Sequence, residues 1–178
     1  GTQEPTAFEL TLAHNEDPPT ALVNLSYNAA TVFPYLEATT NSFYEGGTTP
    51  ISTTIEYEYD DYGNVEALTD TANAGDDSDD VYAEIDYSHE DADCADNHIV
   101  GKPTLITVKN GTGGDWERKR EGKISCTTGN LEWLKQYNED ADGQSVVSET
   151  EFKLYDKYGN LKHLIGPENK HGDSLELL

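Results

Sequence analysis

The sequence contains no methionine, and no stretch is long and apolar enough to span a membrane. A chain without Met does not begin at a natural start codon, so we expect it to be processed or cut from a larger protein. Its opening, GTQEPTAFEL, lacks the basic and apolar regions of a secretory signal peptide. We therefore expect no insertion into a bilayer.

Basic residues are also scarce, and they are absent from residues 1–101. That part carries 22 acidic residues and a charge of −22, whereas residues 102–178 carry 13 acidic and 11 basic residues and a charge of −2. We expect no nucleic-acid partner, because phosphate neutralisation needs a basic face. The surplus of carboxylates indicates a highly soluble surface, or a face that meets a basic partner or divalent cations.

Cysteine is limited to Cys94 and Cys126. Two cysteines are too few to build a fold from disulfides, but they are enough for one bridge. We predict a Cys94–Cys126 disulfide if the chain works outside the cell. The alternative is two unrelated buried thiols.

The residues that are present favour strands over helices. Tyrosine alone supplies 11 residues, and Thr, Val and Ile are frequent. Short alternating segments, separated by turn signals every eight to fifteen residues, predict an all-β fold. The expected strands cover residues 6–13, 20–27, 30–44, 51–70 as a strand, turn and strand, 81–87, 99–108, 115–125, 130–137, 146–155 and 161–165. Residues 71–80 and 88–98 are expected to form acidic loops.

A six-residue motif occurs twice, as YDDYGN and YDKYGN. The motif positions are Tyr59, Asp60, Gly63 and Asn64 in the first copy and Tyr155, Asp156, Gly159 and Asn160 in the second. Asp followed three residues later by Gly is typical of a tight turn between two strands. A degenerate third copy is SCTTGN, which aligns through Gly129, Asn130 and Leu131 and places Ser125 and Cys126 at the Tyr and Asp positions.

These motifs resemble those of YD-repeat proteins, the Rhs and teneurin group. The order of the flanking segments, from VFPYLEATTNSFYEGG to YDKYGNLKHLIGPENKHGDSLEL, is similar to the middle region of Tc-toxin B components and SpvB-like proteins. The similarity covers residues 32–178, which we expect to form a YD-repeat hairpin region. Residues 1–31 match nothing known to us, and we expect them to form an N-terminal β segment of another type.

The resemblance implies consecutive antiparallel β-hairpins that coil into a strip of sheet and close as a hollow shell around a toxic polypeptide. The chain is too short to close a shell, and it has no recognisable self-cleavage segment or toxin tail. We therefore expect a non-catalytic structural segment of a secreted or surface protein. Its partners would be the rest of a larger polypeptide and an enclosed toxin domain. The alternative is a stand-alone extracellular module that binds a partner or assembles with copies of itself, as in an adhesin or filament.

One segment has the spacing of a calcium-binding loop. Asn138, Asp140, Asp142 and Glu149 fall at positions 1, 3, 5 and 12 of that pattern, with Gly143 at position 6. The alternative is a hairpin turn that uses Asp and Gly for its geometry. Apart from calcium, no cofactor is expected.

Two further groups of residues give only weak indications of a binding site. His89, Cys94 and His98 offer zinc ligands, but a structural zinc site needs four at tight spacing. Arg118, Lys119 and Arg120 are the one basic cluster, and strand alternation predicts that they divide between two faces. No nucleophile elbow, phosphate loop or zinc-protease helix is present. A hydrolase built on two carboxylates is the enzyme alternative, but no pair stands out, and we expect no enzyme.

Overall fold

The computed structural model describes residues 8–12, 20–28, 33–44, 48–72, 79–111, 113, 115–139, 145–169 and 171–178. Within these residues the chain forms twelve strands and two short helices, the 3-10 helix η2 (Ser88–Glu90) and α1 (Ala92–Asp96). The predicted all-β class is confirmed. The strands are β1 (Phe8–Leu12), β2 (Thr20–Asn28), β3 (Phe33–Phe43), β4 (Ile51–Tyr59), β5 (Val65–Thr71), β6 (Val81–Tyr87), β7 (Pro103–Asn110), β8 (Trp116–Ile124), β9 (Leu131–Glu139), β10 (Ser145–Tyr155), β11 (Leu161–Glu168) and β12 (Ser174–Leu177).

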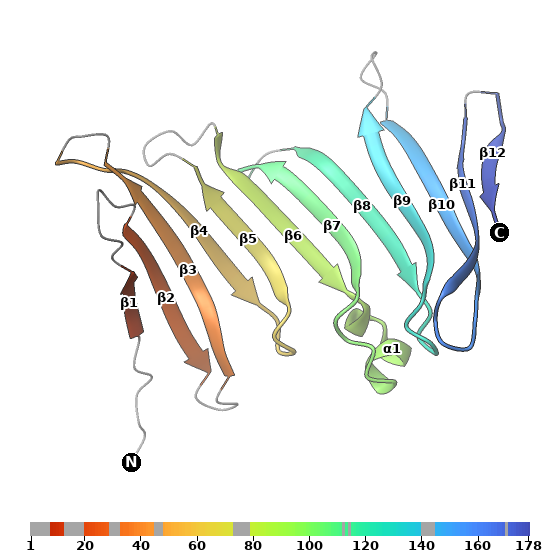
Figure 1. Ribbon diagram of the computed structural model, residues 1–178, viewed down its shortest axis with the longest axis horizontal. Helices are drawn as coiled ribbons and strands as arrows, with labels where there is room; N and C mark the ends of the chain where they lie inside the picture. The colour runs from red at the N-terminus through yellow and green to blue at the C-terminus, as the bar shows by residue number, and fades with distance from the viewer. Residues whose placement is uncertain are drawn as a thin grey trace. The chain divides into compact units, whose positions relative to one another are not determined.

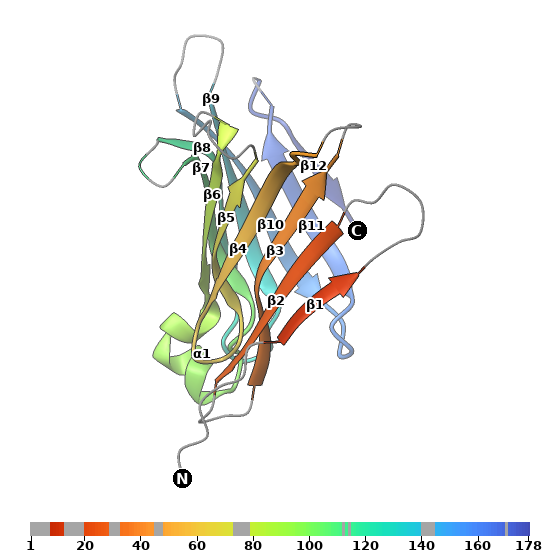
Figure 2. The same ribbon diagram turned by 90° about the vertical axis from the view of Figure 1, so that its left-hand side faces the viewer.

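The chain divides into two units, and β6 and β7 each contribute residues to both. The first unit comprises Gly1–Ala83 and Lys109–Asp115, and the second comprises Glu84–Val108 and Trp116–Leu178. In the first unit β1 to β5 pair in chain order, and every pair is antiparallel (Figures 1 and 2). In the second unit β8 to β12 pair in the same way. Each unit is therefore built from consecutive hairpins.

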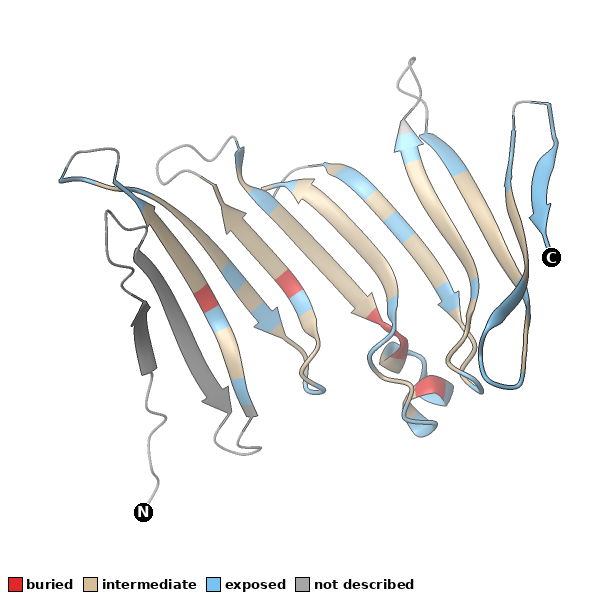
Figure 3. Cartoon of the chain, in the orientation of Figure 1, coloured by how far each residue is buried: buried red, intermediate tan, exposed pale blue. Residues whose placement is uncertain are grey.

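Few side chains are buried in either unit. Of the described side chains, only those of Ala38, Ala67, Tyr87, Ser88 and Cys94 are buried, and most strand residues are half-buried (Figure 3). A sheet gains a dry core when another layer packs on its face. No such layer covers the described strands within their own unit, so each unit depends on strand pairing more than on a core.

Hydroxyl side chains link neighbouring strands of the first unit. Thr40 lies opposite Thr54, and their hydroxyl groups are 3.0 Å apart. Ser42 and Ser52 form the same kind of pair at 3.0 Å, and the Thr71 hydroxyl donates to the backbone oxygen of Thr54 at 3.1 Å. Thr–Thr and Ser–Ser pairs of this type contribute about 0.2–1 kcal/mol each. The abundance of Thr and Ser in these strands thus serves cross-strand bonding.

The expected strands agree with most of the observed ones, with three clear differences. The expected strand 99–108 corresponds to β7, which begins only at Pro103 and ends at Asn110. Residues 88–98, expected as a loop, contain η2 and α1, and Asp91 caps α1 by accepting the Asp93 N–H at 2.9 Å. Strand β12 was not predicted, because its four residues are too few for a clear alternation. Pro103 is the first residue of β7, a position that needs no backbone donor. Much of the expected segment 1–31 lies outside the described residues, so its separate status stays a prediction.

The backbone at Gly159 gives a direct test of the turn geometry. Its φ is +84°, and an added Cβ would contact only the Asn130 side chain, at an ordinary 3.8 Å. We expect Gly159→Ala to lower the free energy of unfolding by about 1–2 kcal/mol through backbone strain alone. Gly159→Asn should cost less, because Asn tolerates this conformation. Denaturant unfolding measures both.

The matched control is Gly113→Ala. Gly113 is not among the positive-φ glycines, and nothing lies within 4 Å of an added Cβ. It should leave the unfolding midpoint nearly unchanged. Equal effects of Gly159→Ala and Gly113→Ala would contradict a strained turn.

Candidate functional site

The first copy of the repeated motif is a five-residue turn organised around Asp60. The Asp60 backbone N–H donates to the Asn64 oxygen at 3.0 Å, and its backbone oxygen accepts the Gly63 N–H at 3.1 Å. Its carboxylate accepts the backbone N–H groups of Tyr62 and Asn64 at 2.9 and 2.8 Å, and the Asn64 side-chain amide at 2.8 Å. Gly63 has φ +83°. Asp and Gly at these positions are therefore required by the turn itself, as predicted.

The second copy repeats these bonds. The Asp156 carboxylate accepts the N–H groups of Tyr158 and Asn160 at 2.8 and 2.9 Å, and the Asn160 side-chain amide at 3.0 Å. The bonds from the Asn160 side chain and backbone, with that from Tyr158, lower the pKa of the Asp156 carboxyl group. The same Asp–Asn pair thus closes a turn in each of the two units.

A β-bulge lies at the same position beside both turns, on the strand that follows the turn. The pairing steps are Glu58–Ala67 to Tyr59–Val65 in the first copy and Leu154–His163 to Tyr155–Leu161 in the second. At this step one residue of the strand after the turn, Glu66 in β5 or Lys162 in β11, has no residue opposite it. A bulge bends the strand and increases its twist, so each motif sets the same bend at the end of its hairpin.

The motif tyrosine ties its hairpin to the preceding strand. The Tyr59 hydroxyl donates to the backbone oxygen of Leu36 in β3 at 3.0 Å, and the Tyr155 hydroxyl donates to that of Leu131 in β9 at 2.7 Å. The Tyr59 ring also lies 5.3 Å from that of Tyr35. Burial raises the pKa of both Tyr59 and Tyr155. Tyrosine at this position therefore joins one hairpin to the strand before it.

The third turn, between β8 and β9, follows the same plan with one extra residue. The Ser125 N–H donates to the Asn130 oxygen at 2.8 Å, the Gly129 N–H donates back to the Ser125 oxygen at 2.8 Å, and Gly129 has φ +73°. Ser125 thus occupies the Asp position and Ile124 the Tyr position, which corrects the alignment expected from the sequence. Cys126, one of the two disulfide cysteines, lies within this longer turn.

A fourth turn, between β11 and β12, was missed in the sequence. The Asn169 N–H donates to the Asp173 oxygen at 2.7 Å, and the Gly172 N–H donates to the Asn169 oxygen at 2.9 Å. The Asn169 side-chain oxygen accepts the N–H groups of His171 and Asp173 at 2.8 and 3.1 Å. Asn and Asp have exchanged places relative to the motif. A pattern of Asn or Asp, two residues, Gly, then Asn or Asp would have found it.

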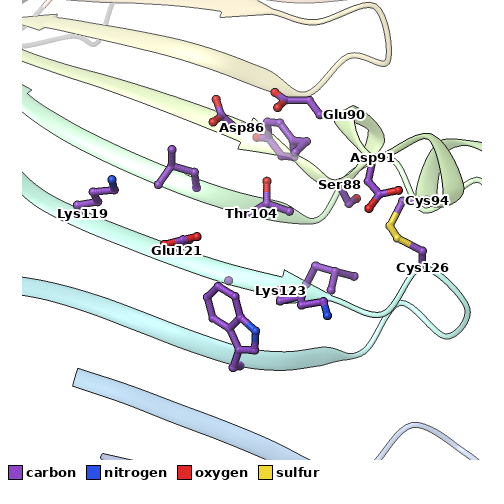
Figure 4. A pocket seen from close by; sticks show the side chains of 15 residues that line it. Asp86, Ser88, Glu90, Asp91, Cys94, Thr104, Lys119, Glu121, Lys123 and Cys126 are labelled. Carbon is purple, nitrogen blue, oxygen red and sulfur yellow. A yellow bond between two sulfur atoms is a disulfide. The ribbon is translucent and has the colours of Figure 1, made fainter. Parts of the chain in front are cut away.

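A groove of about 620 Å³ lies within the second unit, next to the disulfide (Figure 4). Its floor includes Lys119, Glu121 and Lys123, which alternate along one face of β8, and Trp133 of β9 lies directly opposite Lys123. The remaining walls come from β6, η2, α1 and β7. The lining residues are Asp86, Tyr87, Ser88, Glu90, Asp91, Cys94, Thr104, Leu105, Lys119, Glu121, Gly122, Lys123, Ile124, Cys126 and Trp133.

Three charged side chains of this groove, those of Lys119, Glu121 and Lys123, have partners inside the unit. Glu121 accepts the Tyr137 hydroxyl at 2.5 Å, and this bond, with burial and nearby carboxylates, raises the pKa of Tyr137. Lys119 lies 5.0 Å from the Tyr137 ring centre, and Lys123 pairs with Glu132 at 3.2 Å. The arrangement suits a polar surface held in place by cross-strand contacts.

The buried hydroxyl in the groove wall is structural. The Ser88 hydroxyl donates to the Ile99 backbone oxygen at 2.5 Å and accepts the Lys102 N–H at 3.3 Å, while the Ser88 N–H donates to the Lys102 oxygen at 2.8 Å. The Ile99 N–H in turn donates to the Cys94 oxygen at 2.9 Å. These bonds pin the segment 88–102, and they leave Ser88 unsuited to act as a nucleophile.

The predicted disulfide between Cys94 and Cys126 is confirmed. It joins α1 to the third turn, and its Cα–Cα distance is 4.3 Å. Asp91 is close enough that its carboxylate and both sulfur atoms lie within 4.8 Å of one another. While the disulfide is intact, neither sulfur is a thiolate ligand for a metal.

The calcium-loop residues are only partly described. Asp140 and Asp142 lie outside the described residues. Asn138 pairs with Val146, whereas Glu149 pairs with Lys135, so the β9–β10 register places Asn138 and Glu149 on opposite faces of the hairpin. Glu149 also forms an ion pair with Lys135 at 3.8 Å. These two observations favour the hairpin-turn alternative, and the calcium site stays a prediction.

The histidines of the acidic loop do not join a metal cluster in the described part of the chain. His89 contacts the Val100 backbone oxygen at 3.1 Å, and His98 is exposed with φ +57°. The described cluster of metal-binding residue types contains Asp91, Cys94 and Cys126 and neither histidine. In the basic cluster, Lys119 lines the groove while Arg118 and Arg120 are exposed, as alternation predicted.

No protein-family model matches the chain, and no curated protein sequence matches it significantly. Within the described residues, no helix combines the length and the apolar composition that crossing a membrane requires. The function must therefore be inferred from the turns, the groove and the disulfide themselves.

The tyrosine anchor predicts a pH-dependent stability. Tyr155→Phe should lower the free energy of unfolding by about 1 kcal/mol near neutral pH, because one hydrogen bond is lost. Since the pKa of Tyr155 is raised by folding, its contribution is complete below tyrosine's ordinary pKa of about 10 and is lost as the pH rises through the raised value. We expect the difference in free energy of unfolding between wild type and Tyr155→Phe, measured with urea, to be smaller at about pH 11 than at about pH 7.

Tyr158→Phe is the control for this comparison. Tyr158 lies in the same turn but is 77% exposed, so its hydroxyl should contribute little. If Tyr158→Phe destabilises as much as Tyr155→Phe, the anchor to Leu131 is not the cause.

The disulfide predicts a separate loss of stability on reduction. It closes a loop of 32 residues, for which the chain-entropy treatment gives about 3–4 kcal/mol. We expect the double variant Cys94→Ala, Cys126→Ala to lose about this amount in metal-free buffer, measured by denaturant unfolding. A reducing agent should destabilise the wild type and leave the double variant unchanged. A loss below about 1 kcal/mol would show that the bridge does not constrain the unfolded chain.

Proposed function

We propose that this chain is a non-catalytic structural segment of a secreted or surface YD-repeat protein. In this role its hairpins form part of a β-shell that can enclose a toxic polypeptide. The observation that carries the proposal is the repeated turn, in which one set of bonds recurs at Asp60 and Asp156. Repetition of one hairpin unit is the property expected of a chain that extends by adding units.

The tyrosine anchor supports an extending strip. Tyr59 and Tyr155 each bond the backbone of the strand that precedes their own hairpin. The motif therefore fixes one hairpin against the strand before it, and the same contact can be made at every repeat. Such nearest-neighbour contacts stabilise a repeat protein along its length without a central core.

The sparse burial supports the same interpretation. With five buried side chains among those described, each unit gains little from a core of its own. Neighbouring hairpins of the parent protein would supply the missing contacts. The partners that we propose are therefore the remainder of a larger polypeptide and an enclosed toxin domain, and no catalytic activity is proposed for the chain.

The disulfide supports a location outside the cytosol. Disulfides persist in oxidising compartments and are rare where glutathione keeps thiols reduced. The Cys94–Cys126 bridge is therefore compatible with a secreted or cell-surface protein, and we propose that location.

A second candidate is a stand-alone extracellular module that assembles with copies of itself. Strand β12 favours it, because Leu175 and Leu177 are 66% and 51% exposed and all four of its residues are exposed. Exposed apolar edge strands invite pairing with another strand. In this case the hairpins would stack from chain to chain.

The size of the native polypeptide distinguishes the two candidates. An antibody raised against this chain would be used on cell and culture-medium fractions of the source, with antibody pre-adsorbed on the purified chain as the control. A band many times larger than 19.6 kDa in the medium or surface fraction is the expected result. A band near 19.6 kDa would reject the shell segment and favour the assembling module. A band confined to the cytosol would reject both locations.

A further inference from the structure

The groups around the disulfide have the composition of a metal site. Asp91, Cys94 and Cys126 each offer one ligand atom, and these atoms lie within 4.8 Å of one another. Two sulfur ligands and one carboxylate suit zinc, which accepts Cys and Asp in tetrahedral sites. Oxidation to the disulfide removes both thiolates, so this site can exist only in the reduced chain.

The position of Cys94 does not depend on the disulfide. The Ala95 N–H donates to the Asp91 oxygen at 3.0 Å, and the Ile99 N–H donates to the Cys94 oxygen at 2.9 Å. The buried Ser88 bonds both Ile99 and Lys102 and holds the segment to the start of β7. This network contains no sulfur atom, so we expect Cys94 to keep its place when the bridge is reduced.

The position of Cys126 is set in the same way. It lies in the turn closed by the Ser125 and Asn130 backbones, with Gly129 bonded to Ser125 at 2.8 Å. The flanking strands β8 and β9 pair from Lys119–Tyr137 to Ile124–Leu131. The two cysteines are thus carried by separately bonded frames, and reduction leaves two adjacent thiols instead of two free loops.

We propose that the reduced chain binds one zinc ion through Cys94, Cys126 and Asp91, with water as the fourth ligand. Zinc bonds of about 2.3 Å to sulfur and about 2.0–2.2 Å to oxygen place tetrahedral ligand atoms roughly 3.5–3.8 Å apart. The two sulfur atoms are bonded to each other in the disulfide, so on reduction they must move apart to reach this spacing, while the Asp91 carboxylate already lies within 4.8 Å of both. Asp91 is further oriented because its carboxylate accepts the Asp93 N–H at 2.9 Å.

The redox step is balanced by a trialkylphosphine as the reductant. The phosphine takes the oxygen of one water molecule and becomes the phosphine oxide, the S–S bond breaks, and the two hydrogen atoms of the water complete the two thiols. Zinc then displaces one proton from each thiol and forms two Zn–S bonds.

The consequence is a cross-link that survives a change of compartment. In an oxidising environment the disulfide joins α1 to the third turn, and in a reducing environment zinc joins the same two elements through the same sulfur atoms. The groove beside them would keep its end wall in both states. The proposal goes beyond the structural role suggested above and does not depend on it.

Zinc binding to the whole chain, reduced with a trialkylphosphine, tests the proposal. Zinc would be titrated against a chromophoric chelator, and cobalt(II) would be added separately to look for thiolate charge-transfer bands of a tetrahedral site. We expect one equivalent of zinc, with affinity weaker by about a hundredfold or more in the oxidised chain or in Cys126→Ala. Zinc should also raise the melting temperature of the reduced chain and leave that of the oxidised chain unchanged.

Asp91→Asn is the decisive variant, because Asn caps a helix as well as Asp does but has no carboxylate. It should melt like the wild type when oxidised, yet bind zinc about tenfold or more weakly when reduced. Asp93→Asn is the matched control, since Asp93 lies on the same exposed turn and supplies no ligand, and it should bind zinc like the wild type. Wild-type affinity in Asp91→Asn, substoichiometric zinc in the reduced chain, or equal binding by the oxidised chain would each overturn the proposal.

Discussion

Hydrogen bonding between neighbouring strands is the interaction on which each unit of this protein depends. Almost none of the described side chains are buried, so a core contributes little to these strands. Their stability must come from ladders of backbone bonds, cross-strand pairs and the turns that set the register. The turn around Asp60 and its second copy around Asp156 are therefore structural in the strict sense, because they fix which residues pair. The tyrosine hydroxyl that bonds the preceding strand adds a contact that reaches past the hairpin.

The four turns share one backbone arrangement and differ in their side chains and in length. The copies at Asp60 and Asp156 use a carboxylate with an Asn partner, the turn at Asn169 exchanges the two side chains, and the turn at Ser125 keeps the backbone bonds with an added residue. All four turns retain a glycine with positive φ and two backbone hydrogen bonds. In one, the N–H of the first turn residue donates to the oxygen of the last, and in the other, the glycine N–H donates to the oxygen of the first. Backbone geometry is the conserved requirement among these turns, and the side chains vary around it. The disulfide attaches within the longer turn, at Cys126.

Most strands could be predicted from the sequence because alternation and turn residues are local signals, and the Tyr-Asp motif located both tight turns. The register error at Ser125 arose because Gly and Asn fix the end of the turn, whereas one additional residue between Ser125 and Gly129 changes its length. The turn at Asn169 does not match the motif because Asn stands where the motif has Asp. The Asn side-chain oxygen accepts the same backbone N–H bonds as the Asp carboxylate, and a motif defined by residue identity does not include this exchange. The groove and the Asp91 cluster could not be predicted. They depend on how α1 and the third turn meet, and no local pattern in residues 88–98 encodes that meeting.

The disulfide has a mechanical consequence. A meander of hairpins resists tension poorly when its strands are peeled apart one after another, because each ladder bond then carries the load alone. The bridge between Cys94 and Cys126 spans 32 residues, and these residues cannot be drawn out while it is closed. About 110 Å of extended chain is thereby withheld from any pulling force. While the bridge is closed, a stretched molecule would therefore lengthen only in the residues outside this loop.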